Sequence, residues 1–183
     1  MGSEMCIRDR GEPPKKVFIS YAHADFHYKE ELMKYLAGLK REKLIEVWED
    51  GRLNPGDQWD DEIRRQLEQA DWAIMLLSQA FIQSSYIYET ELSLAISKLN
   101  NSGAFRLLPI IIEECDWASL PRFLKNLQSE LESDTGSLDQ IQAMPRGVDN
   151  NDKKILKPIN EWDLPNKAWM EVVKQLRGLI PRS

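Results

Sequence analysis

Two runs of apolar residues restrict the fold of this chain more than any other feature. Residues 17–21 and 73–77 are almost continuously apolar, without the alternation expected of a strand that faces water on one side. Such runs are typical of parallel strands covered by helices on both faces. Segments with apolar residues at helical spacing follow both runs. We therefore expect an α/β protein in which strands alternate with helices and are joined by right-handed crossovers.

The same patterns place the remaining elements. Further strands are predicted at residues 44–48 and 107–112, and a short edge strand is predicted at 155–159. Helices are predicted after Asp25, from Asp57, over 80–99 with Ser78 as its cap, within 117–127, and over 167–180. The fourth strand is expected to start beyond Pro109, because proline is poorly tolerated inside a strand. Five parallel strands between two helical layers match the flavodoxin-like, three-layer doubly wound fold, whose strand carboxyl ends line the ligand crevice.

Length, charge and cysteine content narrow the classes of protein to be considered. With 183 residues and a net charge of −6, the chain favours a single domain without the basic surface of a general nucleic-acid binder. It contains neither an apolar run long enough to cross a membrane nor a signal peptide. Cys6 and Cys115 cannot form a disulfide framework or a zinc site. We expect a cytoplasmic protein that binds no metal, no membrane and no nucleic acid.

The amino-terminal residues are treated apart from the fold. Residues 5–10 resemble translated sequencing-adapter sequence, and a tag or a disordered native arm is an equal alternative. Residues 1–14 are therefore predicted to be a disordered or artefactual arm, and residues 15–181 to form the folded domain. If the arm is an artefact, the loss of the native amino terminus, and of a domain before it, is an open alternative.

Familiar nucleotide-binding members of the fold lack support in this sequence. A dinucleotide-binding domain needs a glycine-rich turn after its first strand, whereas Tyr21, Ala22, His23 and Ala24 stand there. No phosphate-binding P-loop is present. A phospho-receiver domain needs an aspartate after its third strand, where this chain has Ser78.

Several motifs occur in an order that points to another family. They are the opening strand at 17–21, a turn-rich loop at 50–59, the segment 84–92, and the pieces 115–117, 144–145 and 157–169. In this order they resemble the TIR (Toll/interleukin-1 receptor) family, in which the loop at 50–59 is the BB loop. The resemblance runs from residue 16 to about residue 180 and leaves 126–140 as an insertion. It implies the bacterial, NAD-cleaving type of TIR domain.

The resemblance implies that Glu91 is the catalytic carboxylate. On an α-helix Glu91 has Ile87, Leu94 and Ala95 among its neighbours, so it lies at the border of the apolar face. Glu89 has more polar neighbours. The alternative is a solvated helix acid, which is the usual state of a glutamate. A single carboxylate is sufficient for the reaction, because the nicotinamide of NAD is already cationic and leaves without a general acid.

The resemblance also implies a set of positions that contact NAD. They are Tyr21, Ala22, His23, Leu53, Asn54, Gly56 and Ile87. Ala22, Asn54 and Ile87 depart from the basic, acidic and aromatic residues found at these places in some active relatives. His23 supplies positive charge to the substrate or is an ordinary loop histidine. Gly56 is also explained as a turn residue.

Taken with the resemblance, these features predict an NAD glycohydrolase or cyclase that releases nicotinamide and either ADP-ribose or a cyclic isomer. NAD is then the substrate, and no separate cofactor is needed. The family implies a bacterial immune, anti-phage signalling effector that is activated by homotypic self-association through the BB loop, with a separate or missing sensor domain. One alternative is a non-catalytic adaptor that acts only through TIR–TIR contact. A more remote alternative is base exchange on another nucleoside or nucleotide.

Overall fold

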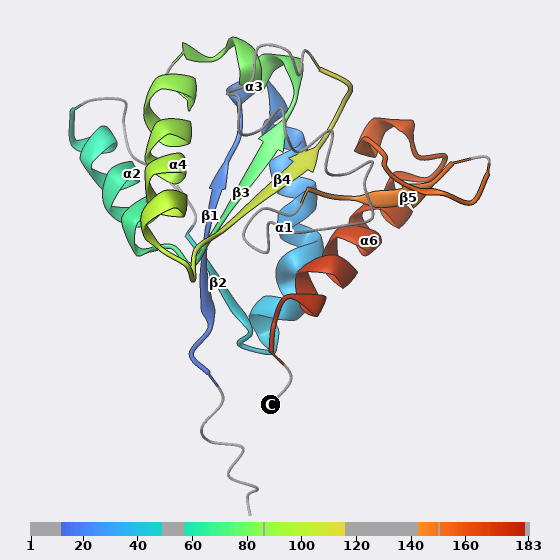
Figure 1. The fold of residues 1–183 in the computed structure, drawn as a ribbon, viewed down its shortest axis with the longest axis horizontal. Coiled ribbons are helices and arrows are strands. Elements are labelled where there is room, and N and C mark those ends of the chain that lie inside the picture. Colours follow the sequence, from blue (N-terminus) through green and yellow to red (C-terminus); the bar gives the residue numbers. More distant parts are fainter. Residues whose placement is uncertain (1–11, 49–56, 86, 116–142, 150, 182–183) are drawn as a thin grey trace, which may run out of the picture.

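A four-stranded parallel sheet forms the centre of the computed structural model, which describes residues 12–48, 57–85, 87–115, 143–149 and 151–181 (Figure 1). The strands are β1 (Lys15–Ser20), β2 (Ile45–Val47), β3 (Trp72–Leu77) and β4 (Arg106–Ile111), in the order β2-β1-β3-β4. Val17 pairs with Val47 on one side and with Trp72 on the other. The predicted α/β class and the doubly wound order of the strands are confirmed.

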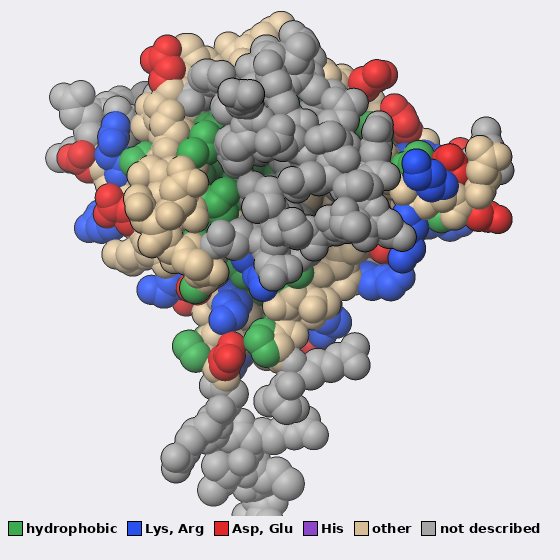
Figure 2. Space-filling view, in the orientation of Figure 1, with side chains coloured by type: hydrophobic (Ala, Val, Ile, Leu, Met, Phe, Trp, Pro, Cys, Tyr) green, Lys and Arg blue, Asp and Glu red, His purple; other side chains and the backbone are tan. Residues whose placement is uncertain are grey.

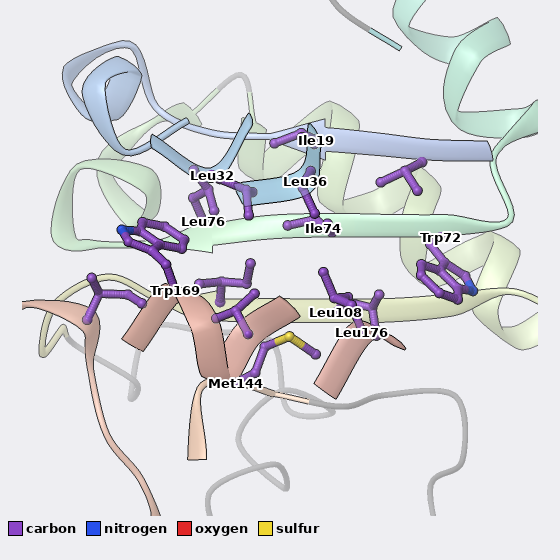
Figure 3. Packing of buried hydrophobic residues seen from close by; sticks show 14 of the residues in the cluster. Ile19, Leu32, Leu36, Trp72, Ile74, Leu76, Leu108, Met144, Trp169 and Leu176 are labelled. Atoms are coloured by element: carbon purple, nitrogen blue, oxygen red, sulfur yellow. The ribbon is translucent and has the colours of Figure 1, made fainter. Parts of the chain in front are cut away.

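Helices cover both faces of the sheet, as the apolar runs predict. Helices α1 (Phe26–Arg41) and α6 (Pro165–Gly178) lie on one face, and α2 (Asp57–Gln69) and α4 (Ser93–Asn101) lie on the other (Figure 1). Alternate residues of β3 enter two separate cores. Trp72, Ile74 and Leu76 pack toward α1 and α6, as seen in Figure 3, whereas Ala73, Met75 and Leu77 pack toward α2 and α4. This alternation, with every residue of β3 buried, explains the unbroken apolar run.

The expected fifth parallel strand at 155–159 is wrong for the described residues. Lys154–Leu156 forms β6, which pairs antiparallel with β5 (Arg146–Val148) in a separate hairpin. On the other side of β4 from β3, the described residue Met144 forms an isolated parallel bridge to Ile110. The segment is flanked by lysines and is at most half-buried, so little apolar surface draws it to the edge of the parallel sheet, and it pairs with β5 instead.

The expectation that β4 starts beyond Pro109 is also wrong, since Pro109 pairs with Met75 in the middle of the strand. The carbonyl oxygen of Pro109 accepts a hydrogen bond of 2.9 Å from the backbone N–H of Met144, on the side away from β3. The N and C=O groups of one strand residue point to the same side. The missing N–H therefore faces the sheet edge, and the β3–β4 ladder is intact.

The single helix predicted over 80–99 is three consecutive segments. They are α3 (Gln79–Gln83), the π-helical turn η2 (Ile87–Leu92) and α4. Ser78 caps α3 as predicted, because its hydroxyl oxygen accepts a hydrogen bond of 3.0 Å from the N–H of Phe81. Asp25 precedes α1 but makes no side-chain capping bond, so its predicted capping role is wrong.

A lysine ties together the two helices on one face. The ammonium group of Lys98 on α4 donates hydrogen bonds to the backbone carbonyls of Leu67, Glu68 and Ala70, where α2 ends. It also lies 4.9 Å from the ring centroid of Phe105. Positive charge at this place compensates the carboxyl end of the helix dipole.

Short 3₁₀ turns complete the described chain, at η1 (His23–Asp25) and η4 (Ile159–Glu161). Charged side chains of both signs are interspersed over the face shown in Figure 2. No helix of the described residues is both long and apolar enough to cross a membrane. Residues 1–11, the predicted helix within 117–127 and the predicted insertion at 126–140 lie outside the described residues.

Candidate functional site

Two buried serines stand where neighbouring strands end. Ser20 is the last residue of β1, and Ser78 directly follows β3. Their exposed fractions are 1% and 0%. The hydroxyl of Ser20 donates to the carboxylate of Glu91, which lies in the segment after β3. The hydroxyl of Ser78 donates to the carboxylate of Asp25, which lies in the segment after β1. The carboxyl end of the sheet, where doubly wound proteins bind ligands, thus carries two buried carboxylates.

The first carboxylate belongs to Glu91, which is 7% exposed. Its Oε2 accepts a short hydrogen bond from Oγ of Ser20, and this bond links η2 to β1. A buried carboxylate is costly unless hydrogen-bond donors satisfy it. Ser20 supplies such a donor from the strand, so Glu91 is held at the sheet and is not a solvated helix acid.

The π-helical turn explains why Glu91 is buried so completely. In an α-helix, residues five positions apart point about 140° away from each other, whereas the i→i+5 bonds of a π-helix bring them nearly into line. Ile87 and Leu92 have this separation, and both lie in the core that faces α2 and α4. With both anchored, Glu91 points to the same buried side. Glu89, on the same turn, is exposed.

The second carboxylate belongs to Asp25. Leu77 faces the core toward α2 and α4, so the next residue, Ser78, and its partner Asp25 lie toward the opposite face of the sheet. Burial is the largest effect on Asp25 and raises the pKa of its carboxyl above the ordinary value. The hydrogen bond from Ser78 opposes this rise, and the nearby charge of Glu113 adds to it. Glu113 itself accepts a 3.0 Å hydrogen bond from the backbone N–H of Gln79. Asp25 therefore joins the loop after β1 to the end of β3, at a cost in desolvation.

Comparison with known proteins identifies the family to which this fold belongs. The family model of the TIR domain matches residues 17–142, which is more than half of the chain. The chain belongs to the TIR domain family. The resemblance found in the sequence is thereby confirmed at the level of the family.

Relatives of this TIR domain include an uncharacterised protein of Sinorhizobium fredii, y4lF. The two are 31% identical over 166 residues, which cover 91% of this chain but 44% of that protein. The chain thus spans less than half the length of this relative.

Two solved structures share the fold. The TIR domain of the Toll-related receptor TRR-2 from Hydra magnipapillata has a TM-score of 0.52 and 17% identity, over 88% of this chain and 97% of that chain. The structure of the RPS4 and RRS1 TIR domain heterodimer has a TM-score of 0.50 and 14% sequence identity, over 91% of this chain and 99% of that chain. At these identities the likeness shows the fold alone.

The TIR domain brings part of the predicted NAD-binding set to the side of the sheet that holds Glu91. Ala22 and Ile87 are both 5% exposed and belong to the core facing α2 and α4. Tyr21 packs on the other side, where its ring lies 6.3 Å from that of Phe26. His23 is exposed at the start of η1. Leu53, Asn54 and Gly56, in the BB loop, lie outside the described residues.

Sequence reasoning missed Ser20 as a partner of Glu91. One signal was available, because Ser20 is the first polar residue in the buried part of an otherwise apolar strand. Its partner could not be found in this way, since 71 positions separate the two residues. Asp25 and Ser78 were interpreted as caps, which left the bond between them unforeseen.

A cavity of about 320 Å³ lies away from Glu91, beside β2 and the last turns of α2. Its lining consists of Lys16, Val17, Glu46, Val47, Trp48, Gln66, Gln69 and Ala70. Neither Glu91 nor Ser20 lines this cavity, so it is separate from the two buried carboxylates. Within the described part of the chain, no three His, Cys, Asp or Glu side chains gather as a metal site.

Proposed function

We propose that this TIR domain cleaves NAD at the bond between nicotinamide and ribose, with Glu91 as the catalytic carboxylate. The observation that carries the proposal is the burial of Glu91 at the carboxyl end of β1, where Ser20 binds its carboxylate. Buried carboxylates with a specific partner are characteristic of functional sites, because burying a charge reduces stability and such groups are kept where function requires them. Membership of the TIR family supports the choice of reaction.

The chemistry needs one negative charge in a place shielded from bulk water. The C–N bond opens with its electron pair passing to nicotinamide, which leaves as a neutral molecule, and positive charge develops on the ribose. A fixed carboxylate stabilises this charge more strongly in a buried site than in water. Water then adds to the ribose carbon and releases a proton, giving ADP-ribose. Attack by a group within the same molecule gives a cyclic isomer.

Glu91 acts in this proposal without a paired acid. Ordinary glycosidases use two carboxylates because their leaving group must be protonated. Asp25 is the other buried carboxylate among the described residues, and it is bound to Ser78 on the opposite face of the sheet. The cationic leaving group of NAD removes the need for such a second acid.

Self-assembly is the second part of the proposal. The RPS4 and RRS1 TIR domains form a heterodimer in their structure. By analogy, copies of this domain associate through the BB loop at 50–59, complete the active site and signal in bacterial anti-phage immunity. A head-to-tail contact of this kind is heterologous and extends into an open filament where the rotation between copies does not close a ring. Activity should therefore rise steeply with protein concentration.

Product analysis tests the reaction. The full chain is incubated with NAD over a series of protein concentrations, with and without a crowding agent, and nicotinamide, ADP-ribose and its cyclic isomers are separated by chromatography. We expect nicotinamide to appear in equal amount to NAD lost, and Glu91→Ala to reduce its release about 10²–10³-fold. Parallel incubations with other nucleosides test base exchange. Wild-type protein that assembles but leaves NAD intact would overturn the proposal and favour the adaptor.

A further inference from the structure

The hydroxyl of Ser20 is held at a fixed place in the molecule. Ser20 pairs with Met75 in the parallel ladder between β1 and β3, so its backbone belongs to the centre of the sheet. Its side chain is 1% exposed and is directed toward the core that contains Phe18 and Ala22. A hydroxyl in such surroundings needs a hydrogen-bond partner. The partner is Oε2 of Glu91.

Glu91 has less intrinsic rigidity than Ser20. It is carried by a six-residue π-helical turn, and a glutamate side chain has several freely rotating bonds. Catalytic groups must be held within a fraction of an ångström by neighbours whose own positions are fixed. A hydroxyl on a central strand satisfies that requirement for one carboxylate oxygen.

We infer that Ser20 is the positioning residue for the Glu91 carboxylate, which its hydroxyl orients at the end of β1. The inference rests on the proposed function for its catalytic consequence. Ser20 acts through Glu91, so it needs no contact with NAD. Ser78 offers a comparison, because it makes the same type of bond to Asp25 and also caps α3.

Kinetics of Ser20 variants test the inference in the full chain. Ser20→Ala should lower kcat about 10–100-fold, as loss of an orienting partner does elsewhere, while KM changes little. Because the ionised carboxylate loses a donor, the acid limb of the kcat–pH profile should move to higher pH. Ser20→Thr keeps the hydroxyl and should restore both. Ser20→Cys, a weak donor of similar shape, should lie between.

Matched controls separate positioning from stability. Ser78→Ala removes an equally buried hydroxyl from the same edge of the sheet and should leave the acid limb in place. Adding Ser20→Ala to Glu91→Gln should cause no further loss of kcat, because the group being positioned is absent. A fully additive loss, or a normal kcat and acid limb in folded Ser20→Ala, overturns the inference and leaves the proposed function intact.

A measurement without turnover makes the two failures distinguishable. The carboxyl ¹³C signal of Glu91, assigned by its loss in Glu91→Gln, is titrated by NMR in wild type and in Ser20→Ala. We expect a higher midpoint in the variant. If wild type does not consume NAD, the proposed function fails, yet the titration still decides on Ser20. An unchanged midpoint overturns the inference whatever the activity.

Discussion

Ser78 Oγ lies 2.5 Å from Oδ2 of Asp25 and donates a hydrogen bond to it across the end of the sheet. The bond joins the end of β3 to the turn η1, and therefore to the loop that carries Ala22 and His23. Burial raises the pKa of Asp25 more than this bond lowers it. The connection thus holds a loop of the candidate site in place, although the ionised carboxylate reduces the stability of the fold.

Asp25→Asn should consequently gain stability relative to wild type as the pH rises. The folded-state pKa lies above the ordinary value of 3.8, so the folded protein keeps a proton that the unfolded chain has released. Stability from Asp25 is highest below 3.8 and is lost as pH rises through the raised pKa. Asparagine removes this loss and still offers Ser78 an acceptor. Urea unfolding of both proteins from about pH 4 to about pH 7 measures the difference.

Asp149→Asn is a control of opposite sign. Backbone N–H groups of Lys153 and Asn151 lower the pKa of Asp149, so its stabilising contribution is present at neutral pH and is lost as pH falls through the lowered value. Relative to wild type, the stability of Asp149→Asn should therefore fall as the pH rises from the lowered pKa to 3.8 and stay nearly level above it, so its unfolding series extends below about pH 4. A relative stability of Asp25→Asn that is flat or falling from about pH 4 to about pH 7 contradicts the account of Asp25.

Lys98→Met should destabilise the domain by about 1–3 kcal/mol, because carbonyls at the end of α2 lose a charged donor. The contact of Lys98 with the ring of Phe105 is lost as well. Thermal and urea unfolding measure the change. Lys174→Met is the matched control, since Lys174 is exposed and makes a 3.4 Å ion pair with Glu171, and its loss should stay within about 0.5 kcal/mol. Equal effects of the two substitutions would show that Lys98 does not stabilise α2.

Deletion of Glu89 should leave the domain folded. It places Ile87 four positions from Leu92 and three from Glu91 in the shortened chain, and an α-helix then keeps all three on one face. Circular dichroism and thermal unfolding should show a helical protein at least as stable as wild type. Deletion of Ser97 in α4 should instead disrupt packing, because it turns the apolar stripe by about 100°. If both deletions are equally damaging, the π-helical turn is not a one-residue insertion in a helix.

The strands could be predicted from the sequence because a strand buried on both faces needs a continuous apolar run, such as 73–77. Such a run is visible in the local sequence. The predictions for Pro109 and for the strand at 155–159 are wrong because the structure at both places depends on a neighbouring segment. Met144 lies beside the edge of Pro109 that lacks an N–H, and β6 pairs with β5. Neither partner is visible in a pattern of period two or 3.6.

The resemblance to the TIR family and the apolar neighbours that Glu91 would have on an α-helix both point to Glu91. The structure buries it by a different route, since a π-helical turn aligns Ile87 with Leu92. The role of Ser20 could not be predicted, because a hydrogen bond between residues 71 positions apart produces no periodic pattern in the sequence. The chemistry of a site can thus be suggested by a motif, whereas the groups that hold it in place emerge from the fold.

The most direct test of Glu91 as the catalytic carboxylate is the rate of nicotinamide release. This rate is measured for Glu91→Gln, Glu89→Gln and wild type, side by side, at protein concentrations that permit assembly. The two glutamates occupy one turn and differ in burial, Glu91 being 7% exposed and Glu89 exposed to solvent. We predict that Glu91→Gln loses about 10²–10³-fold in rate and remains folded, while Glu89→Gln keeps the wild-type rate. Release of nicotinamide by Glu91→Gln at the wild-type rate would contradict the assignment of Glu91.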